Sequence, residues 1–150
     1  MKILLAIDGS EYSSEAVKIV VGRPWTEGTE VRVLTAVEPV APPATELWYD
    51  AGGSLERARQ EMQTRAEQLT AGVVETLRAG GLTAEAVVRD GEPRSAIVDE
   101  AKEWEADLVV LGSHGYTGLK RWLLGSVAQA VVSHAPCSVE VVRKKQTEEI

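Results

Sequence analysis

The sequence predicts an α/β protein built on one doubly wound, five-stranded, mainly parallel sheet with helices on both faces. Short apolar runs bounded by turn residues are typical of buried strands, and helix-like segments with apolar residues three and four apart separate them. Strands that alternate with helices favour parallel pairing through right-handed crossovers. The length of 150 residues is typical of one domain, so we expect residues 1–150 to form a single domain.

The first strand is predicted over Ile3–Ile7, a short apolar run that ends at an Asp-Gly-Ser turn. A helix follows, because Ala16, Val17, Val20 and Val21 have helical spacing, with Ser10 or Ser13 as its N-cap and Gly22 at its end. The later predicted elements are a strand over Val31–Val37, a proline-rich loop over residues 39–53, a helix over Ser54–Arg78 with Ser54 as N-cap, a strand over Thr83–Arg89, a helix with Pro93 in its first turn, a strand over Asp107–Leu111, a helix over Val127–Ser133 and a strand over Ser138–Val142.

Charge and composition argue against two classes of partner. The formal net charge is −7, from 16 basic and 23 acidic residues, whereas a nucleic-acid partner requires clustered Lys and Arg. The same charge disfavours an anionic membrane surface, and no run approaches the roughly 20 apolar residues of a membrane span. Cys137 is the single cysteine, which excludes an internal disulfide. The first apolar run is too short for a signal peptide, so we expect a cytoplasmic protein.

A glycine-rich segment follows the fourth predicted strand with the spacing G-x2-G-x9-G-S, at Gly112, Gly115, Gly125 and Ser126. Gly115 and Gly118 keep the loop free of Cβ atoms and are expected to allow positive φ. Gly125 and Ser126 open a helix, whose unpaired N–H groups and dipole favour an anion. These features form a candidate phosphate cradle, although the spacing alone is equally typical of a turn followed by a capped helix.

The segment is neither of two common phosphate-binding motifs. No Gly-Lys-Ser/Thr triplet is present, which excludes a Walker A loop, and Asp8-Gly9-Ser10 stands after the first strand where a dinucleotide fingerprint would lie. Ligands of doubly wound sheets bind beyond the carboxyl ends of the strands, where the strand order reverses. We therefore expect Asp8 and the glycine segment to face one another across a binding site.

The sequence resembles the universal stress protein family over its whole length, in KILLAIDGSEYSSEAV at the start and DLVVLGSHGYTGLKRWLLGSVAQAVVSHAPCSVEVVR at the end. The nucleotide-binding members of that family carry the motif G-x2-G-x9-G-S/T, which is complete here. The resemblance implies a Rossmann-like fold of the adenine nucleotide alpha hydrolase type and an adenine-nucleotide site. It makes ATP the leading ligand, with Mg²⁺ carried by the triphosphate.

The resemblance also implies roles for individual residues. Asp8 corresponds to the acidic residue that accepts hydrogen bonds from the ribose hydroxyls, and Ala6 and Ala36 correspond to positions that line the adenine pocket. The loop beneath ribose and phosphates corresponds to Leu111, Gly112, Ser113, His114 and Gly115, and the phosphate-binding helix start to Gly125, Ser126 and Val127.

The family further implies a homodimer through the last strand, a regulatory role in the stress response and a regulatory protein partner. No residue is expected to be catalytic or to bind a metal directly. His114 has no nucleophile or second titratable group at a suitable spacing, which favours a loop role. A slow ATPase or nucleotidyl-transfer enzyme, and an interaction module that binds AMP or cAMP, are the alternatives. In the proline-rich loop, Trp48 and Tyr49 are equally consistent with a lid, a partner contact or surface packing.

Overall fold

Five strands form one sheet in the order β3-β2-β1-β4-β5, and all four neighbouring pairs are parallel. The computed structural model describes residues 1–39, 53–115 and 123–145; Trp48, Tyr49 and Gly118 lie outside them. The sheet confirms the predicted doubly wound α/β class, because the strand order reverses between β1 and β4. The elements are β1 (Lys2–Ala6), α1 (Glu11–Gly22), β2 (Glu30–Val37), α2 (Ser54–Ala79), β3 (Thr83–Asp90), α3 (Pro93–Glu103), β4 (Leu108–Gly112), α4 (Ser126–His134) and β5 (Ser138–Val142).

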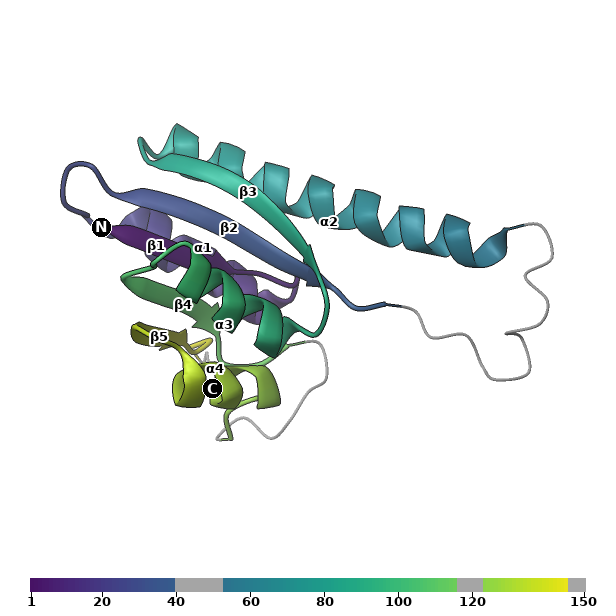
Figure 1. The fold of residues 1–150 in the computed structure, drawn as a ribbon. Helices are drawn as coiled ribbons and strands as arrows, with labels where there is room; N and C mark the ends of the chain where they lie inside the picture. The colour runs from purple at the N-terminus through teal and green to yellow at the C-terminus, as the bar shows by residue number, and fades with distance from the viewer. Residues whose placement is uncertain (40–52, 116–122, 146–150) are drawn as a thin grey trace, which may run out of the picture.

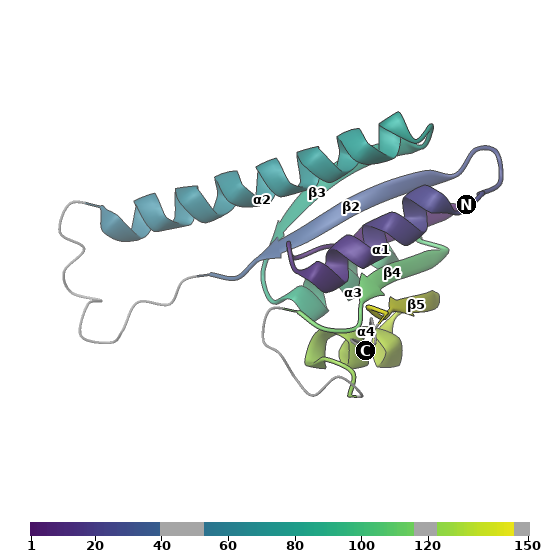
Figure 2. The same cartoon turned by 180° about the vertical axis from the view of Figure 1, so that it is seen from behind.

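The four helices cover the two faces of the sheet, α1 and α2 on one and α3 and α4 on the other (Figures 1 and 2). Strand β1 shows why, because its side chains alternate between two apolar cores. Ile3 and Leu5 pack with α1 and α2, whereas Leu4 and Ala6 pack with α3 and α4. A strand buried on both faces reads as a continuous apolar run, which is how β1 and β4 appear in the sequence.

The helix starts follow the predicted capping chemistry in one case and differ in another. Ser10 caps α1, and its Oγ accepts a hydrogen bond from the N–H of Ser13 at 3.3 Å. Ser54, predicted as the N-cap of α2, is instead the first residue of that helix, and Gly53 is the N-cap with φ +70°. The left-handed backbone at this position favours glycine, so the cap moved by one residue.

Strand β5 lies at one edge of the sheet and is tied to α1 by two ion pairs. The guanidinium of Arg23, at the end of α1, donates to both carboxylate oxygens of Glu140 at 2.6 and 2.7 Å, and this hydrogen bonding lowers the pKa of Glu140. Beyond the strand, Lys144 Nζ donates to Glu11 Oε2 at 2.6 Å. The two ion pairs therefore connect β5 to the end of α1 and the segment after β5 to the start of α1. Among the described helices, none is long and apolar enough to cross a membrane.

A buried carboxylate anchors α3 to the other side of the sheet. Glu100 is 6% exposed, and its two oxygens accept hydrogen bonds from Arg32 Nη1 of β2 and Arg89 Nη1 of β3, each at 2.7 Å. Glu103, one turn further along α3, accepts a second bond from Arg89 Nη1 at 2.9 Å. These carboxylates raise the pKa of Arg89. The network fixes how α3 lies across β2 and β3.

We expect the substitution Glu100→Gln to lower the free energy of unfolding by about 2 kcal/mol, because two arginines lose a shared buried counter-charge. Glu103→Gln is the matched control; its side chain is 67% exposed, so its loss should stay below about 1 kcal/mol. Urea unfolding measures both, as a shift of the midpoint at unchanged slope. Equal shifts for the two variants would contradict a special role for Glu100.

Candidate functional site

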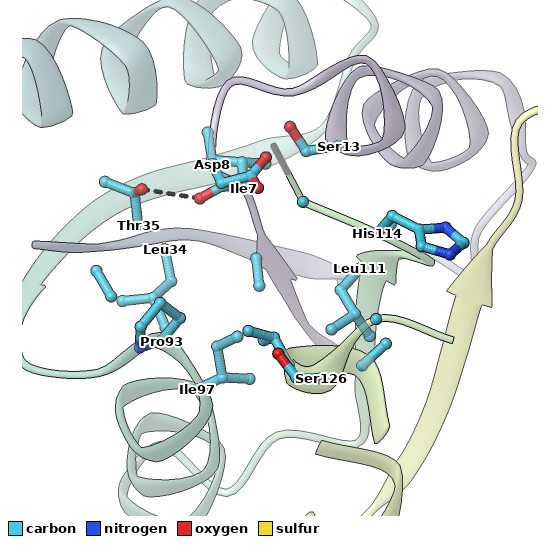
Figure 3. A pocket seen from close by; sticks show the side chains of 17 residues that line it. Ile7, Asp8, Ser13, Leu34, Thr35, Pro93, Ile97, Leu111, His114 and Ser126 are labelled. Atoms are coloured by element: carbon cyan, nitrogen blue, oxygen red, sulfur yellow. Dashed lines mark hydrogen bonds between the residues drawn. The ribbon is translucent and has the colours of Figure 1, made fainter. Parts of the chain in front are cut away.

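A pocket opens where the strand order reverses, at the carboxyl ends of β1, β2 and β4 (Figure 3). Parallel strands all end at this edge, so the segments that follow them meet there. The cavity volume is about 130 Å³. Its lining residues are Ala6, Ile7, Asp8, Ser13, Leu34, Thr35, Ala36, Pro93, Ile97, Leu111, Gly112, His114, Gly115, Gly125, Ser126, Val127 and Ala128.

The structure brings all the sequence-predicted site residues into this pocket except Ser113. Ser113 is 1% exposed, and its backbone connects the loop after β4 to two neighbouring segments. Its N–H donates to the carbonyl of Val142 in β5, and its own carbonyl accepts from the N–H of Gly125, both at 2.8 Å. Its backbone therefore connects β5 to the start of α4, while its neighbours on either side line the pocket.

Sequence reasoning missed several lining residues, most of them apolar. Leu34 and Thr35 precede Ala36 on the same strand, so the position of Ala36 already pointed to them. Pro93 and Ile97 come from the first turns of α3, which follows β3. The rule that ligands bind beyond the carboxyl ends of strands would have included this helix start. The remaining missed residues are Ile7, Ser13 and Ala128.

One side of the pocket is an apolar slot. In Figure 3, Leu34, Pro93 and Ile97 lie together on the side of α3, with Leu111 across from them on β4. The hydroxyl of Thr35 donates to the carbonyl of Ile7 at 2.8 Å, so it is already satisfied within the protein. A slot of this kind favours a flat apolar or aromatic group, whose polar edge would be recognised at only a few points.

The other side of the pocket is polar and contains the start of α4. Gly125 is the N-cap of this nine-residue helix, and no side chain caps it. The first N–H groups of a helix have no acceptor within the helix. At α1 the Ser10 side chain occupies one such donor, whereas no described side chain caps the first turn of α4, which begins at Ser126. This helix start offers backbone donors and a favourable dipole to an anion.

Asp8 is the only charged side chain among the described residues that line the pocket. Its Oδ1 accepts a hydrogen bond from the N–H of Ser10 at 2.8 Å, which orients the carboxylate. Its Oδ2 lies so close to Gly115 that a Cβ atom there would be 2.8 Å away. Within residues 1–39, 53–115 and 123–145, no cluster of three or more His, Cys, Asp or Glu side chains is arranged to hold a metal ion.

The three glycines of the motif make room for the protein's own atoms. A Cβ at Gly112 would lie 2.7 Å from Tyr12 of α1, and a Cβ at Gly125 would lie 3.1 Å from the carbonyl oxygen of Ser113. The expectation of positive φ at Gly115 was wrong, because its backbone lies outside that region. A side chain at this position would instead displace the carboxylate of Asp8, a constraint that the local sequence pattern does not contain.

The imidazole of His114 points away from the pocket, toward α1 and β5 (Figure 3). His114 is 6% exposed, and its Nδ1 lies 3.0 Å from Ser113 Oγ. Its ring contacts the ring of Tyr12, with centroids 5.0 Å apart. Its Nε2 is buried and has no hydrogen-bond partner among the described residues. The ring therefore packs against Tyr12 of α1, on the side of the loop that faces away from the pocket.

Known proteins resemble this chain in sequence over nearly its full length. The sequence model of the universal stress protein family matches residues 1–143. Universal stress protein Sll1388 from Synechocystis sp. is 33% identical over 150 residues, which cover 95% of this chain and 97% of the relative. Universal stress protein MJ0531 from Methanocaldococcus jannaschii is 33% identical over 147 residues, covering 98% of this chain and 84% of the relative.

Solved structures share the fold. The protein MJ0577 has a TM-score of 0.83 at 27% identity, with 97% of each chain covered. A universal stress protein family protein from Arabidopsis thaliana, described with AMP bound, has a TM-score of 0.70 at 20% identity over 97% of this chain and 92% of its own. A universal stress protein in complex with cAMP has a TM-score of 0.66 at 23% identity over 97% of this chain and 98% of its own.

The sequence matches and the fold agree with one another. The match extends from the first strand to the residue after the last one, so it includes every element that lines the pocket. The two relatives exceed 30% identity over almost the whole chain. This chain belongs to the universal stress protein family.

Proposed function

We propose that the chain binds an adenine nucleotide, with ATP as the leading ligand, and acts in the cytoplasm as a nucleotide-dependent regulator of the stress response. The observation that carries this proposal is the composition of the pocket. An apolar slot for a base lies opposite a helix start without a side-chain cap, and Asp8 lies in the same pocket. These parts match the three chemical regions of a nucleotide.

Each region of the nucleotide would have its own partner. The adenine ring would occupy the slot between Leu34, Ile97 and Leu111, and the ribose hydroxyls would donate to the carboxylate of Asp8. The phosphates would accept hydrogen bonds from the first-turn N–H groups of α4 and from the Ser126 hydroxyl. Backbone donors supply this contact without a dedicated lysine.

The charge of the pocket favours a metal-bound triphosphate. A nucleoside triphosphate carries several negative charges, and among the described lining residues Asp8 adds another one. Mg²⁺ prefers phosphate oxygens and water to an all-protein cage, so it would enter with the nucleotide and lower its charge. Binding of ATP should therefore be stronger with Mg²⁺ than with excess chelator.

AMP or cAMP is the second candidate ligand. The observation that favours it is that two structural neighbours are described with these nucleotides bound. Both contain adenosine, with the 3′-oxygen esterified in cAMP, and both carry less phosphate charge than ATP, so they suit a pocket whose described lining has no cationic side chain. Mass spectrometry of nucleotides that copurify with the native protein would separate the two candidates.

The free edge of β5 supports the proposal of a homodimer through the last strand. In the described part of the chain, β5 pairs with β4 alone. An exposed edge presents unpaired backbone groups, and a second copy of the same strand can satisfy them across a two-fold axis. A partner protein that responds to nucleotide binding would complete the regulatory function.

Purified protein should bind ATP in calorimetric titrations with Mg²⁺, and Gly115→Val and Gly125→Val should weaken binding at least tenfold, about 1.4 kcal/mol. Both substitutions force a side chain against Asp8 or the loop carbonyl. Gly72→Ala is the matched control, because a Cβ at that helical position of α2 meets nothing within 4 Å. Parallel titrations with AMP and cAMP rank the ligands. A parent protein that binds none of them refutes the proposed function.

The ribose contact predicts that Asp8→Asn weakens ATP binding about fivefold, because a charged hydrogen-bond acceptor is replaced by a neutral one. The amide oxygen can still accept from Ser10, so the turn should persist. Titration with 2′-deoxy-ATP is the control; if Asp8 holds the 2′-hydroxyl, the variant and the parent should differ less for this ligand. Equal losses for both nucleotides would argue against a contact between Asp8 and the 2′-hydroxyl.

The dimer predicts a two-chain mass in sedimentation velocity at micromolar concentration. The carbonyl of Val142 faces β4, so the backbone of Val141 faces the free edge. Val141→Pro removes one outward N–H and should give a monomer that keeps its fold by circular dichroism, because edge strands tolerate proline. A parent protein that stays monomeric, or a variant that dimerises normally, would contradict pairing through β5.

A further inference from the structure

The loop that lines the pocket after β4 is clamped between α1 and β5. On one side, Gly112 pairs with Val142 at the end of β5, and the N–H of Ser113 donates to the Val142 carbonyl at 2.8 Å. On the other side, the loop meets the first turn of α1. The Lys144–Glu11 ion pair joins the start of α1 to the segment after β5, so both sides of the clamp are connected.

Tyr12 provides the contact on the side of α1. A Cβ at Gly112 would lie 2.7 Å from the carbonyl carbon and from the Cβ of Tyr12, and 2.9 Å from its carbonyl oxygen. The backbone of Tyr12 thus rests directly on the last residue of β4. Its ring reaches further along the loop, to the imidazole of His114. Tyr12 does this without lining the pocket.

His114 links the ring of Tyr12 to the loop that lines the pocket. Its buried ring packs against Tyr12, whereas its backbone belongs to the loop between Ser113 and Gly115. Its Nδ1 lies 3.0 Å from Ser113 Oγ in the same loop, whereas its Nε2 has no hydrogen-bond partner in the described part of the chain, so among these interactions only the ring contact with Tyr12 joins the imidazole to α1. Next along the loop, Gly115 lies against the carboxylate of Asp8. A displaced His114 ring would therefore change the distance between the loop and Asp8.

We propose that Tyr12 is a positioning residue of the nucleotide site. Its ring holds His114, and through His114 it holds the backbone of Ser113–Gly115 at the distance where the loop and Asp8 form one wall. This inference rests on the proposed nucleotide binding and adds to it a residue outside the pocket. The predicted site residues include His114 and its neighbour Ser113, whose Oγ lies 3.0 Å from His114 Nδ1, but no residue of α1 that holds the ring.

The test compares Tyr12→Ala with Tyr12→Phe and with Ile19→Ala. Tyr12→Ala removes the ring contact and should weaken ATP binding about tenfold. Tyr12→Phe keeps the ring and should restore affinity to within about twofold of the parent. Ile19 lies on α1 and is 37% exposed, so Ile19→Ala controls for a general change in that helix. Calorimetric titration with Mg-ATP measures the affinities, and thermal unfolding measures stability.

Two further readouts separate positioning from general stability. Hydrogen exchange of the amides of residues 113–115, without nucleotide, should be faster in Tyr12→Ala and unchanged in Ile19→Ala. In a double-mutant cycle, Tyr12→Ala and His114→Ala together should cost little more affinity than one alone, because they act through the same contact. If Tyr12→Ala unfolds, Tyr12→Leu takes its place in both measurements.

The outcomes are distinct. A parent protein that binds no nucleotide refutes the proposed function, whatever the variants do. A parent that binds ATP together with a Tyr12→Ala variant of equal affinity overturns the role of Tyr12 alone. Additive losses in the double-mutant cycle, or unchanged exchange at residues 113–115, also overturn it.

Discussion

The close approach of α1 to the end of β4 is the contact on which the geometry of the site depends. Gly112 permits it, because any larger residue would place a Cβ within 2.7 Å of Tyr12. With α1 in this position, Asp8 and the loop after β4 face one another across the point where the strand order reverses. The same contact brings Lys144 within reach of Glu11, so that the edge strand β5 and the pocket share one support.

Parallel strands explain why so many helix starts meet at one pocket. Each strand runs in the same direction, so each following helix begins at the same edge of the sheet. The first turns of α1, α3 and α4 contribute Ser13, Pro93 and Ser126 to the lining. The Ser10 side chain caps α1, whereas within the described residues neither α3 nor α4 has a side-chain cap, and Pro93 removes one donor from the first turn of α3. The apolar side chains of Pro93 and Ile97 make the α3 side of the pocket apolar, and Glu100 keeps α3 in its place.

Much of the fold could be predicted because its signals are local. The alternation of apolar runs and helical segments gives the order of elements, and the bounds that were predicted differ from the observed ones by at most one residue at either end, as between Ile3–Ile7 and Lys2–Ala6. Asp8 and the glycine segment were placed at one site because strand ends converge. The same rule also covers the start of α3, which follows β3, but it does not say which of its side chains reach the pocket; that Pro93 and Ile97 do so depends on how α3 crosses the sheet. The N-cap of α2 was misplaced by one residue because backbone conformation at Gly53 decides it.

The sequence by itself determined the α/β class, the parallel sheet, the family and the residues that follow the first and fourth strands, because periodicity, turn residues and motif spacing are properties of neighbouring positions. Only the tertiary structure decided what those residues do to one another. The motif glycines are required by Tyr12, Asp8 and the carbonyl of Ser113, which are distant in the chain or on another element. The direction of the His114 ring and the apolar wall from α3 likewise arise from packing between elements, which no local pattern encodes.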